Sequence, residues 1–139
     1  MSTAKTLTFL LMDPPYESAN STTALRIIDA AIRKGYHVNV TAYEGAVAYT
    51  YGLQKPHQNP IKGTTVEQEK HPNTKDWVAA LIKAAQGRGL KLDWLRCGMC
   101  EDERGLYENQ IAGTRPGSPV DFYKQQVEPA DNALVIPCR

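Results

Sequence analysis

The chain has 139 residues and a formal net charge of +1, with 42% hydrophobic and 22% charged residues. This length and balance are typical of a globular protein, and we expect a single domain over residues 1–139. Lysines and arginines are scattered along the chain, so direct nucleic-acid binding is not expected, because it needs a concentrated basic surface. The longest apolar run, residues 7–12, is too short to cross a membrane and lacks a secretory cleavage region. We therefore expect a cytoplasmic protein without membrane contact.

The first half of the chain predicts a strand, a helix, a second strand and a short helix. An apolar run that stops at Asp13-Pro14-Pro15 indicates a buried strand. The following helix, which Ser18 or Ser21 would cap, has apolar residues at spacings of three and four up to Gly35. A β-rich run at residues 36–43 and a helical segment at residues 44–51 come next. Two strands joined by one helix should run parallel.

The second half begins with a polar segment at residues 52–73 that contains three prolines. It is too long for an ordinary connection, and we expect a loop insertion that serves as a flap or an oligomer contact. The pattern then predicts a helix, a strand, a short helix, another helix and a last strand, near residues 77–87, 90–95, 101–107, 119–127 and 133–136. The expected fold class is α/β: a three-layer α/β/α sandwich around a mainly parallel sheet of about five strands.

Cys97, Cys100 and Cys138 are the cysteines of the chain. Their odd number argues against a disulfide framework and favours metal, redox or sulfur chemistry. Each follows a predicted strand, as Asp13 does, and active groups of open parallel sheets collect at the carboxyl ends of the strands. We therefore expect all three sulfur atoms on one rim of the sheet. Cys100 should stand just before the helix at residues 101–107, whose N-terminus and Arg104 would favour its thiolate, whereas the acidic residues of that turn oppose it.

The segment around the cysteines resembles the active loop of the DsrE/DsrF-like family, which includes the TusD subunit of the tRNA-thiolation sulfur relay. The family pattern is a cysteine, three residues and then Arg-Gly, directly after a strand. Here it falls on Cys100, Arg104 and Gly105. The N-terminal half is similar as well, at residues 7–12, Asp13-Pro14-Pro15, Asn20, Ala24-Leu25 and Gly35-Tyr36-His37-Val38, with Tyr36 inserted where members often have Gly-His. The similarity covers most of the chain and is weakest at residues 52–73.

This resemblance implies sulfur transfer. Cys100 would attack a donor's persulfide as thiolate, hold the sulfane sulfur as its own persulfide, and yield it to the next carrier's thiolate, which requires no metal or organic cofactor. Arg104 and Gly105 would support it, and Asp13 is a candidate general base, although Asp before Pro-Pro is also ordinary turn chemistry. The implied partners are TusA-like carriers or other DsrE-like subunits, in homo- or hetero-oligomers, commonly trimers or hexamers. Cys97 could form a disulfide with Cys100, hold a trisulfide, or be a neighbouring thiol.

Two alternatives use the same cysteines differently. A C-x-x-C pair near a βαβ unit is also typical of thiol–disulfide redox proteins, although there the pair opens a helix after the first core strand. Cys97 and Cys100 also have the spacing of metal ligands, and His57 and His71 could complete a Cys/His metal-binding module. For Cys138 we expect the role of a small buried apolar side chain.

Overall fold

The computed structural model describes residues 4–138, and its centre is a five-stranded sheet. The strand order is β4-β3-β2-β1-β5, and every neighbouring pair is parallel. The strands are β1 (Thr6–Leu11), β2 (His37–Ala42), β3 (Leu92–Cys97), β4 (Thr114–Gly117) and β5 (Asn132–Ile136). The helices are α1 (Asn20–Arg33), the 3₁₀ helix η1 (Glu44–Thr50), α2 (Thr74–Gly87), α3 (Gly98–Glu103), α4 (Pro119–Asp121) and the π-helix η2 (Phe122–Val127).

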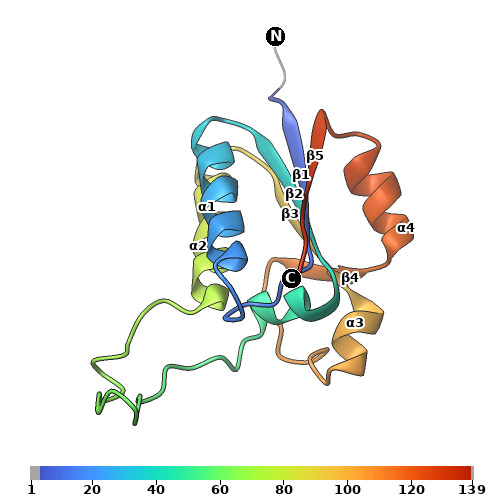
Figure 1. Cartoon of the computed structure of the whole chain (residues 1–139). Coiled ribbons are helices and arrows are strands. Elements are labelled where there is room, and N and C mark those ends of the chain that lie inside the picture. Colours follow the sequence, from blue (N-terminus) through green and yellow to red (C-terminus); the bar gives the residue numbers. More distant parts are fainter. Residues whose placement is uncertain (1–3, 139) are drawn as a thin grey trace.

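Helices cover both faces of the sheet, and this confirms the predicted three-layer α/β/α class. Figure 1 shows α1 and α2 side by side on one face and α4, which continues into η2, on the other. The short helix α3 and η1 lie at the end of the sheet where the strands terminate. The parallel pairing of β1 with β2 confirms the predicted strand–helix–strand unit.

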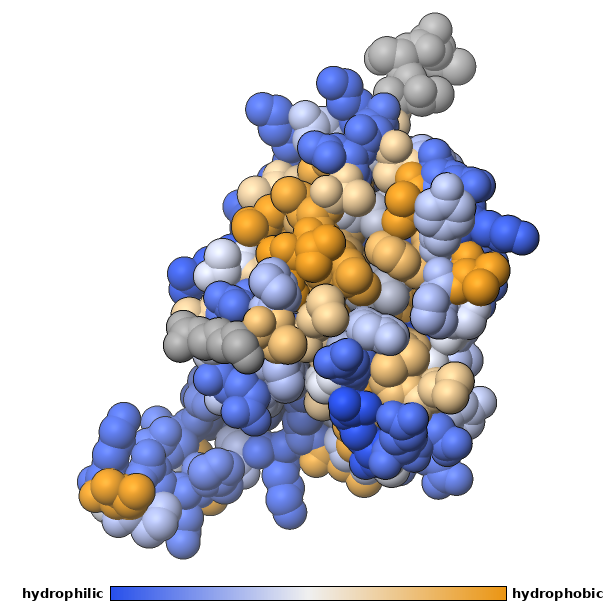
Figure 2. Space-filling model, turned by 45° about the vertical axis from the view of Figure 1, so that its right-hand side comes forward, coloured by the Kyte–Doolittle hydropathy of each residue, from blue (hydrophilic) through white to orange (hydrophobic). Residues whose placement is uncertain are grey.

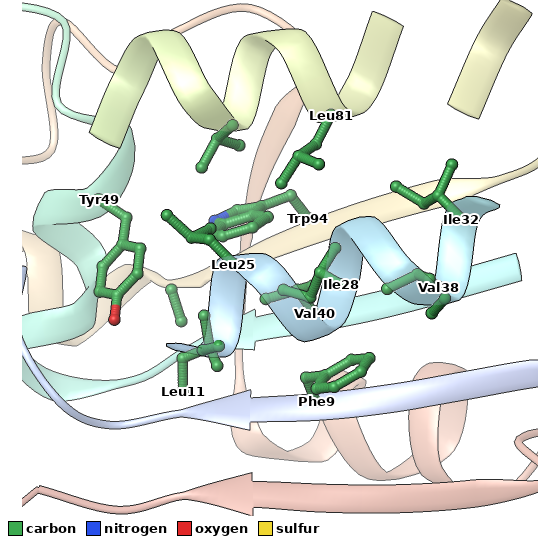
Figure 3. Close-up of a cluster of buried hydrophobic side chains, with 14 of the residues drawn as sticks. Phe9, Leu11, Leu25, Ile28, Ile32, Val38, Val40, Tyr49, Leu81 and Trp94 are labelled. Atoms are coloured by element: carbon green, nitrogen blue, oxygen red, sulfur yellow. The ribbon is translucent and has the colours of Figure 1, made fainter. Parts of the chain in front are cut away.

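The face under α1 and α2 holds the main hydrophobic core (Figure 3). Alternate residues of β1 and β2, together with Trp94 of β3, point to this side because side chains alternate along a strand. The helices contribute one apolar stripe each. The buried core side chains include Phe9, Leu11, Leu25, Ile28, Ile32, Val38, Val40, Val78, Leu81 and Trp94.

The opposite face is polar at its centre. Gln126 in η2 is fully buried, and its side chain and backbone carbonyl together bond to three strands. Its Oε1 accepts a hydrogen bond from the Thr41 hydroxyl at 2.6 Å, and its Nε2 donates to the Val40 carbonyl oxygen and to the Asp93 carboxylate. Its own carbonyl oxygen accepts from the Thr8 hydroxyl at 2.6 Å. These bonds satisfy polar groups that would otherwise be costly to bury.

Two elements near the cysteines differ from the sequence prediction. The short helix spans Gly98–Glu103 rather than residues 101–107. Strand β4 lies between the predicted helices at residues 101–107 and 119–127, where the sequence predicted no strand. It pairs with β3 alone at the edge of the sheet, where a proline such as Pro116 is tolerated because one side of the strand needs no partner.

Residues 52–73 form the expected long connection between η1 and α2. It extends away from the sheet (Figure 1), with an isolated bridge between Asn59 and Thr64. Its return to α2 is fixed by Tyr16, whose hydroxyl oxygen accepts hydrogen bonds from the Asn73 amide and the Thr74 backbone N–H. Within residues 4–138, no helix has the length and apolar character that a membrane crossing requires.

Candidate functional site

The cysteine pair lies at the junction of β3 and α3. Cys97 is the last residue of β3 and the N-cap of α3, and its Sγ accepts the backbone N–H of Cys100 at 3.3 Å. Cys100 is therefore the third residue of the helix, and the prediction that it stands just before the helix is wrong. The cause is that the Cys97 side chain, rather than that of Cys100, caps the free N–H groups of the first turn. Cysteine is not a usual N-cap residue, so the start of this helix could not be predicted from its capping residue.

The two sulfur atoms are in disulfide contact. The structure pairs Cys97 with Cys100, and their Cα atoms are 5.2 Å apart, within the range that a disulfide spans. Both are almost fully buried, with exposed fractions of 6% and 7%, and they pack against Val47 of η1, Tyr43 and Leu106. The first of the three possibilities for Cys97, a disulfide with Cys100, is therefore sterically available without movement of the backbone.

Arg104 and Gly105 end α3. Gly105 has a φ of +68°, which favours glycine, and its N–H donates to the Asp102 carbonyl oxygen while the Leu106 N–H donates to that of Glu101. This pair of bonds is a Schellman motif, which closes a helix C-terminus. The Arg104 guanidinium donates to the carbonyl oxygen of Cys100 at 3.1 Å. The Arg-Gly pair thus fixes the short helix that carries Cys100.

A buried ion pair encloses the cysteine segment. Arg96 directly precedes Cys97, and Glu101 directly follows Cys100. Their side chains meet at 2.6 Å, with 8% and 0% of the side chain exposed. Burial raises the pKa of Glu101, although the charge and hydrogen bond of Arg96 oppose the shift. Because the ion pair links the residue before Cys97 to the residue after Cys100, it fixes the segment that carries both cysteines.

Two connected cavities meet at the cysteine pair. The outer groove, about 340 Å³, has both cysteines in its wall and is lined further by Glu44, Met99, Glu103 and Arg104. The inner cavity, about 230 Å³, lies under the start of α4 and is lined mainly by apolar side chains, among them Leu10, Leu95 and Phe122. Cys97 borders both, whereas Cys100 borders only the outer groove. The groove that both cysteines line therefore carries charged side chains, whereas the cavity that Cys97 alone of the pair lines is mainly apolar.

Gly117 of β4 keeps the two cavities close together. It lines both, and a Cβ at this position would collide with the Leu95 side chain. Sequence reasoning missed this wall of the site because it missed β4 itself. The same holds for Arg96 and Glu101 as a pair: the sequence shows two oppositely charged residues five apart but not that both are buried.

The remaining predicted residues lie in other surroundings. Asp13 is buried after β1, accepts a hydrogen bond from Ser18 at 2.5 Å, and borders neither cavity of the cysteine pair. It is near Tyr49, whose pKa is raised by burial and further by the Asp13 charge. Cys138 follows β5 and is exposed, so the prediction of a buried apolar role is wrong. The cause is that β5 is an edge strand, most of whose residues are exposed.

The histidines do not join the cysteines. His57 and His71 are exposed and line a pocket of about 390 Å³ in the long connection, together with Tyr16. Among residues 4–138 there is no group of three or more His, Cys, Asp or Glu side chains that could hold a metal ion. The Cys/His metal-binding alternative therefore has no geometric support in the part of the chain that the structure describes.

The fold and the site together define a class of protein: a parallel α/β sandwich with a buried cysteine pair at the carboxyl end of a strand. Sequence comparison then gives the family: the model of the DsrE/DsrF-like family matches residues 5–136, and the chain belongs to this family. A comparison with curated protein sequences finds no match. The fold is similar to the crystal structure of the YchN protein from E. coli, with a TM-score of 0.67, 19% sequence identity, and coverage of 94% of this chain and 98% of that one.

Proposed function

We propose that this protein is a cytoplasmic sulfur-relay protein that accepts sulfane sulfur as a persulfide on Cys100 and passes it to a partner carrier. The observation that carries the proposal is the position of Cys100 in the wall of the outer groove, in a member of the DsrE/DsrF-like family. The thiolate of Cys100 attacks the terminal sulfur of a donor persulfide, and the donor leaves as thiolate. Arg104 lines the groove and would supply positive charge for this anionic exchange, next to the carboxylates of Glu44 and Glu103 in the same wall.

Burial of the two sulfur atoms supports a role in protecting the bound sulfane sulfur. A persulfide exposed to water and other thiols is lost to exchange, and access decides how fast that exchange runs. Cys100 is 7% exposed, so only a donor or acceptor that fits the groove reaches it. The partners that we propose are TusA-like carriers or other DsrE-like subunits, whose reactive thiol would enter the groove past Met99.

We also propose that the chain works as a homo- or hetero-oligomer, such as a trimer or hexamer. The support is the edge strand β5, where Leu134 and Val135 are 41% and 56% exposed. Figure 2 shows hydrophobic side chains gathered on the side of the molecule that carries this strand. An open strand edge with apolar side chains favours association, because it offers both unpaired backbone groups and apolar area. Analytical ultracentrifugation of the wild type and of Val135→Lys tests it: a wild-type monomer contradicts the proposal.

A second candidate function is thiol–disulfide exchange by the Cys97/Cys100 pair. It is favoured by the disulfide contact between the two sulfurs and by the helix that starts at this pair. In that case a protein disulfide, rather than a persulfide, would be the substrate.

Intact-protein mass spectrometry separates these functions. Reduced wild-type protein and the variants Cys97→Ser, Cys100→Ser and Cys138→Ser are each mixed with inorganic polysulfide or with a persulfidated carrier protein. The proposal predicts added sulfur mass that reductant removes in Cys97→Ser, which keeps Cys100 without its neighbouring thiol, and no added mass in Cys100→Ser. Sulfur uptake by Cys100→Ser at the level of Cys97→Ser would exclude Cys100 as the carrier. Loss of two hydrogens with a disulfide substrate, and no uptake of sulfur in any variant, would favour the redox function.

A further inference from the structure

Persulfide transfer through Cys100 leaves the second thiol without a role, although the structure places it in bonding contact with the first. Cys97 lies next to Cys100 at a Cα separation of 5.2 Å, and both are fixed by secondary structure on each side. A persulfide formed on Cys100 would therefore be held beside a second thiol at high effective concentration. Such proximity accelerates an intramolecular exchange by orders of magnitude over the same reaction between separate molecules.

We propose that Cys97 is a resolving thiol, and that the protein reduces persulfides: it discharges the sulfane sulfur of Cys100 as hydrosulfide and ends as the Cys97–Cys100 disulfide. This inference rests on the proposed function, since Cys100 must first accept the sulfur. It adds an activity, persulfide reduction, and a substrate class, hydropersulfides of low-mass or protein thiols.

The two steps balance in atoms and electrons. In the first, the Cys100 thiolate forms a bond to the terminal sulfur of R–S–SH, the S–S bond of the donor breaks, and RS⁻ leaves. In the second, the Cys97 thiolate forms a bond to Sγ of Cys100, the bond from that Sγ to the sulfane sulfur breaks, and HS⁻ leaves. The sulfane sulfur gains two electrons and the two cysteines together lose two. An external dithiol reduces the disulfide and is itself oxidised to a disulfide, which restores both thiols.

The outer groove gives the leaving group of the second step room beside Cys100. Displacement at sulfur needs the attacking atom and the leaving atom on opposite sides of the sulfur under attack. Cys97 borders the inner cavity and the outer groove, whereas Cys100 borders the outer groove alone. A sulfane sulfur on Cys100 can therefore occupy the outer groove, and the displacement requires that it lies opposite Cys97 Sγ there. The anion that leaves enters this groove, which Arg104 lines together with Glu44 and Glu103.

The local hydrogen bond suits Cys97 to attack. The backbone N–H of Cys100 donates to Cys97 Sγ at 3.3 Å, and an anionic sulfur is the better acceptor for that bond. The acidic residues of this region belong to α3 and η1: Glu101 is paired with Arg96, and Asp102, Glu103 and Glu44 are the others. The bond from the backbone stabilises negative charge on Cys97 Sγ, whereas the neighbouring carboxylates oppose it.

The test is a single-turnover experiment with glutathione persulfide. Fully reduced wild-type protein, Cys97→Ser and Cys138→Ser are each mixed with one equivalent, and released hydrosulfide is trapped with monobromobimane while the protein is weighed by mass spectrometry. We expect one equivalent of hydrosulfide and a loss of two hydrogens for the wild type and for the matched control Cys138→Ser. We expect Cys97→Ser to gain the mass of one sulfur and to release no hydrosulfide above the protein-free background.

Three other results would contradict the inference, and each would identify a different cause. A wild type that keeps the added sulfur and releases none would overturn the resolving role and leave the carrier function intact. Hydrosulfide release by Cys97→Ser at the wild-type level would show that another thiol discharges the persulfide. Failure of both the wild type and Cys97→Ser to take up or release sulfur would overturn the carrier function as well.

Discussion

The two faces of the sheet differ in what they bury. The face under α1 and α2 is a continuous apolar core from Phe9 to Trp94, whereas the face under α4 and η2 has the polar contacts of Gln126 and a cavity of about 230 Å³. Close apolar packing contributes most of the free energy of folding, and a cavity forgoes part of it. Stability and chemistry therefore depend on different faces of the sheet. The α1/α2 face stabilises the fold, and the α4 face leaves room beside the cysteines.

The largest loss of stability is expected from the apolar face. Trp94 is fully buried between β3 and the two helices, with its ring centroid 6.2 Å from that of Tyr49 (Figure 3). Trp94→Ala should lower the free energy of unfolding by about 3–5 kcal/mol, because it removes a large apolar side chain and leaves a cavity. Urea denaturation measures it. If the loss is below that of Phe122→Ala, which borders a cavity already present, the proposed division of roles between the faces is contradicted.

The buried ion pair at the cysteines should come next. Glu101→Leu removes one partner and leaves the Arg96 guanidinium buried without its counter-charge, so we expect a loss of about 3 kcal/mol in the free energy of unfolding. The double variant Arg96→Met/Glu101→Leu is the control, and it should recover most of that loss because no charge remains buried. Equal stability of Glu101→Leu and the wild type would show that the pair does not hold the segment.

A smaller effect is expected from the polar centre of the α4 face. Gln126→Leu keeps the side-chain size but leaves the Thr41 hydroxyl without its acceptor, and the expected loss is about 2 kcal/mol. Exposed Lys124, in the same helix η2, provides the control, and Lys124→Ala should change stability by less than about 0.5 kcal/mol. Thermal unfolding of both variants measures the difference. Equal losses of stability in the two variants would show that the buried Gln126 amide does not stabilise this face.

The pH dependence of the same face should be smaller again. Burial alone would raise the pKa of Asp93, but hydrogen bonds from Arg115 and Gln126 and the charge of Arg115 outweigh it and hold this pKa below the ordinary 3.8. The lowered pKa means that the stabilisation is present above about pH 4 and is lost as the pH falls through the folded-state pKa. Asp93→Asn should cost about 1 kcal/mol at pH 7 and give a flatter stability curve between pH 5 and pH 2, a range that urea titrations cover. An unchanged slope would contradict the assignment.

The sequence predicted the apolar face well and the site only in part. The apolar runs and the spacing of three and four in α1 follow directly from burial on one side, so the strands, helices and parallel pairing were confirmed. Strand β4 was missed because its Thr-Arg-Pro-Gly segment has no apolar alternation, and it is held by its pairing with β3 and by the ion pair of Arg115 with Asp93. The start of α3 was misplaced because the side chain that caps it is a cysteine.

Residues of the site could be predicted only where their spacing in the sequence forms a known pattern. Cys100, Arg104 and Gly105 stood out through their spacing, and the structure explains the last two as the end of α3. The burial of Arg96 against Glu101 and the inner cavity depend on how α3, η1 and α4 meet. No local sequence pattern predicts how these elements pack together, because their contacts involve residues far apart in the chain.

The most direct test of the central claim uses proteins with a single cysteine. The variant Cys97→Ser/Cys138→Ser keeps only Cys100, and the matched variant Cys100→Ser/Cys138→Ser keeps only Cys97. Both are reduced, mixed with inorganic polysulfide, freed of small molecules and weighed by mass spectrometry. We predict that the protein with Cys100 alone gains sulfur that reductant removes, and that the protein with Cys97 alone gains little. Sulfur held on Cys97 and not on Cys100 would contradict the account.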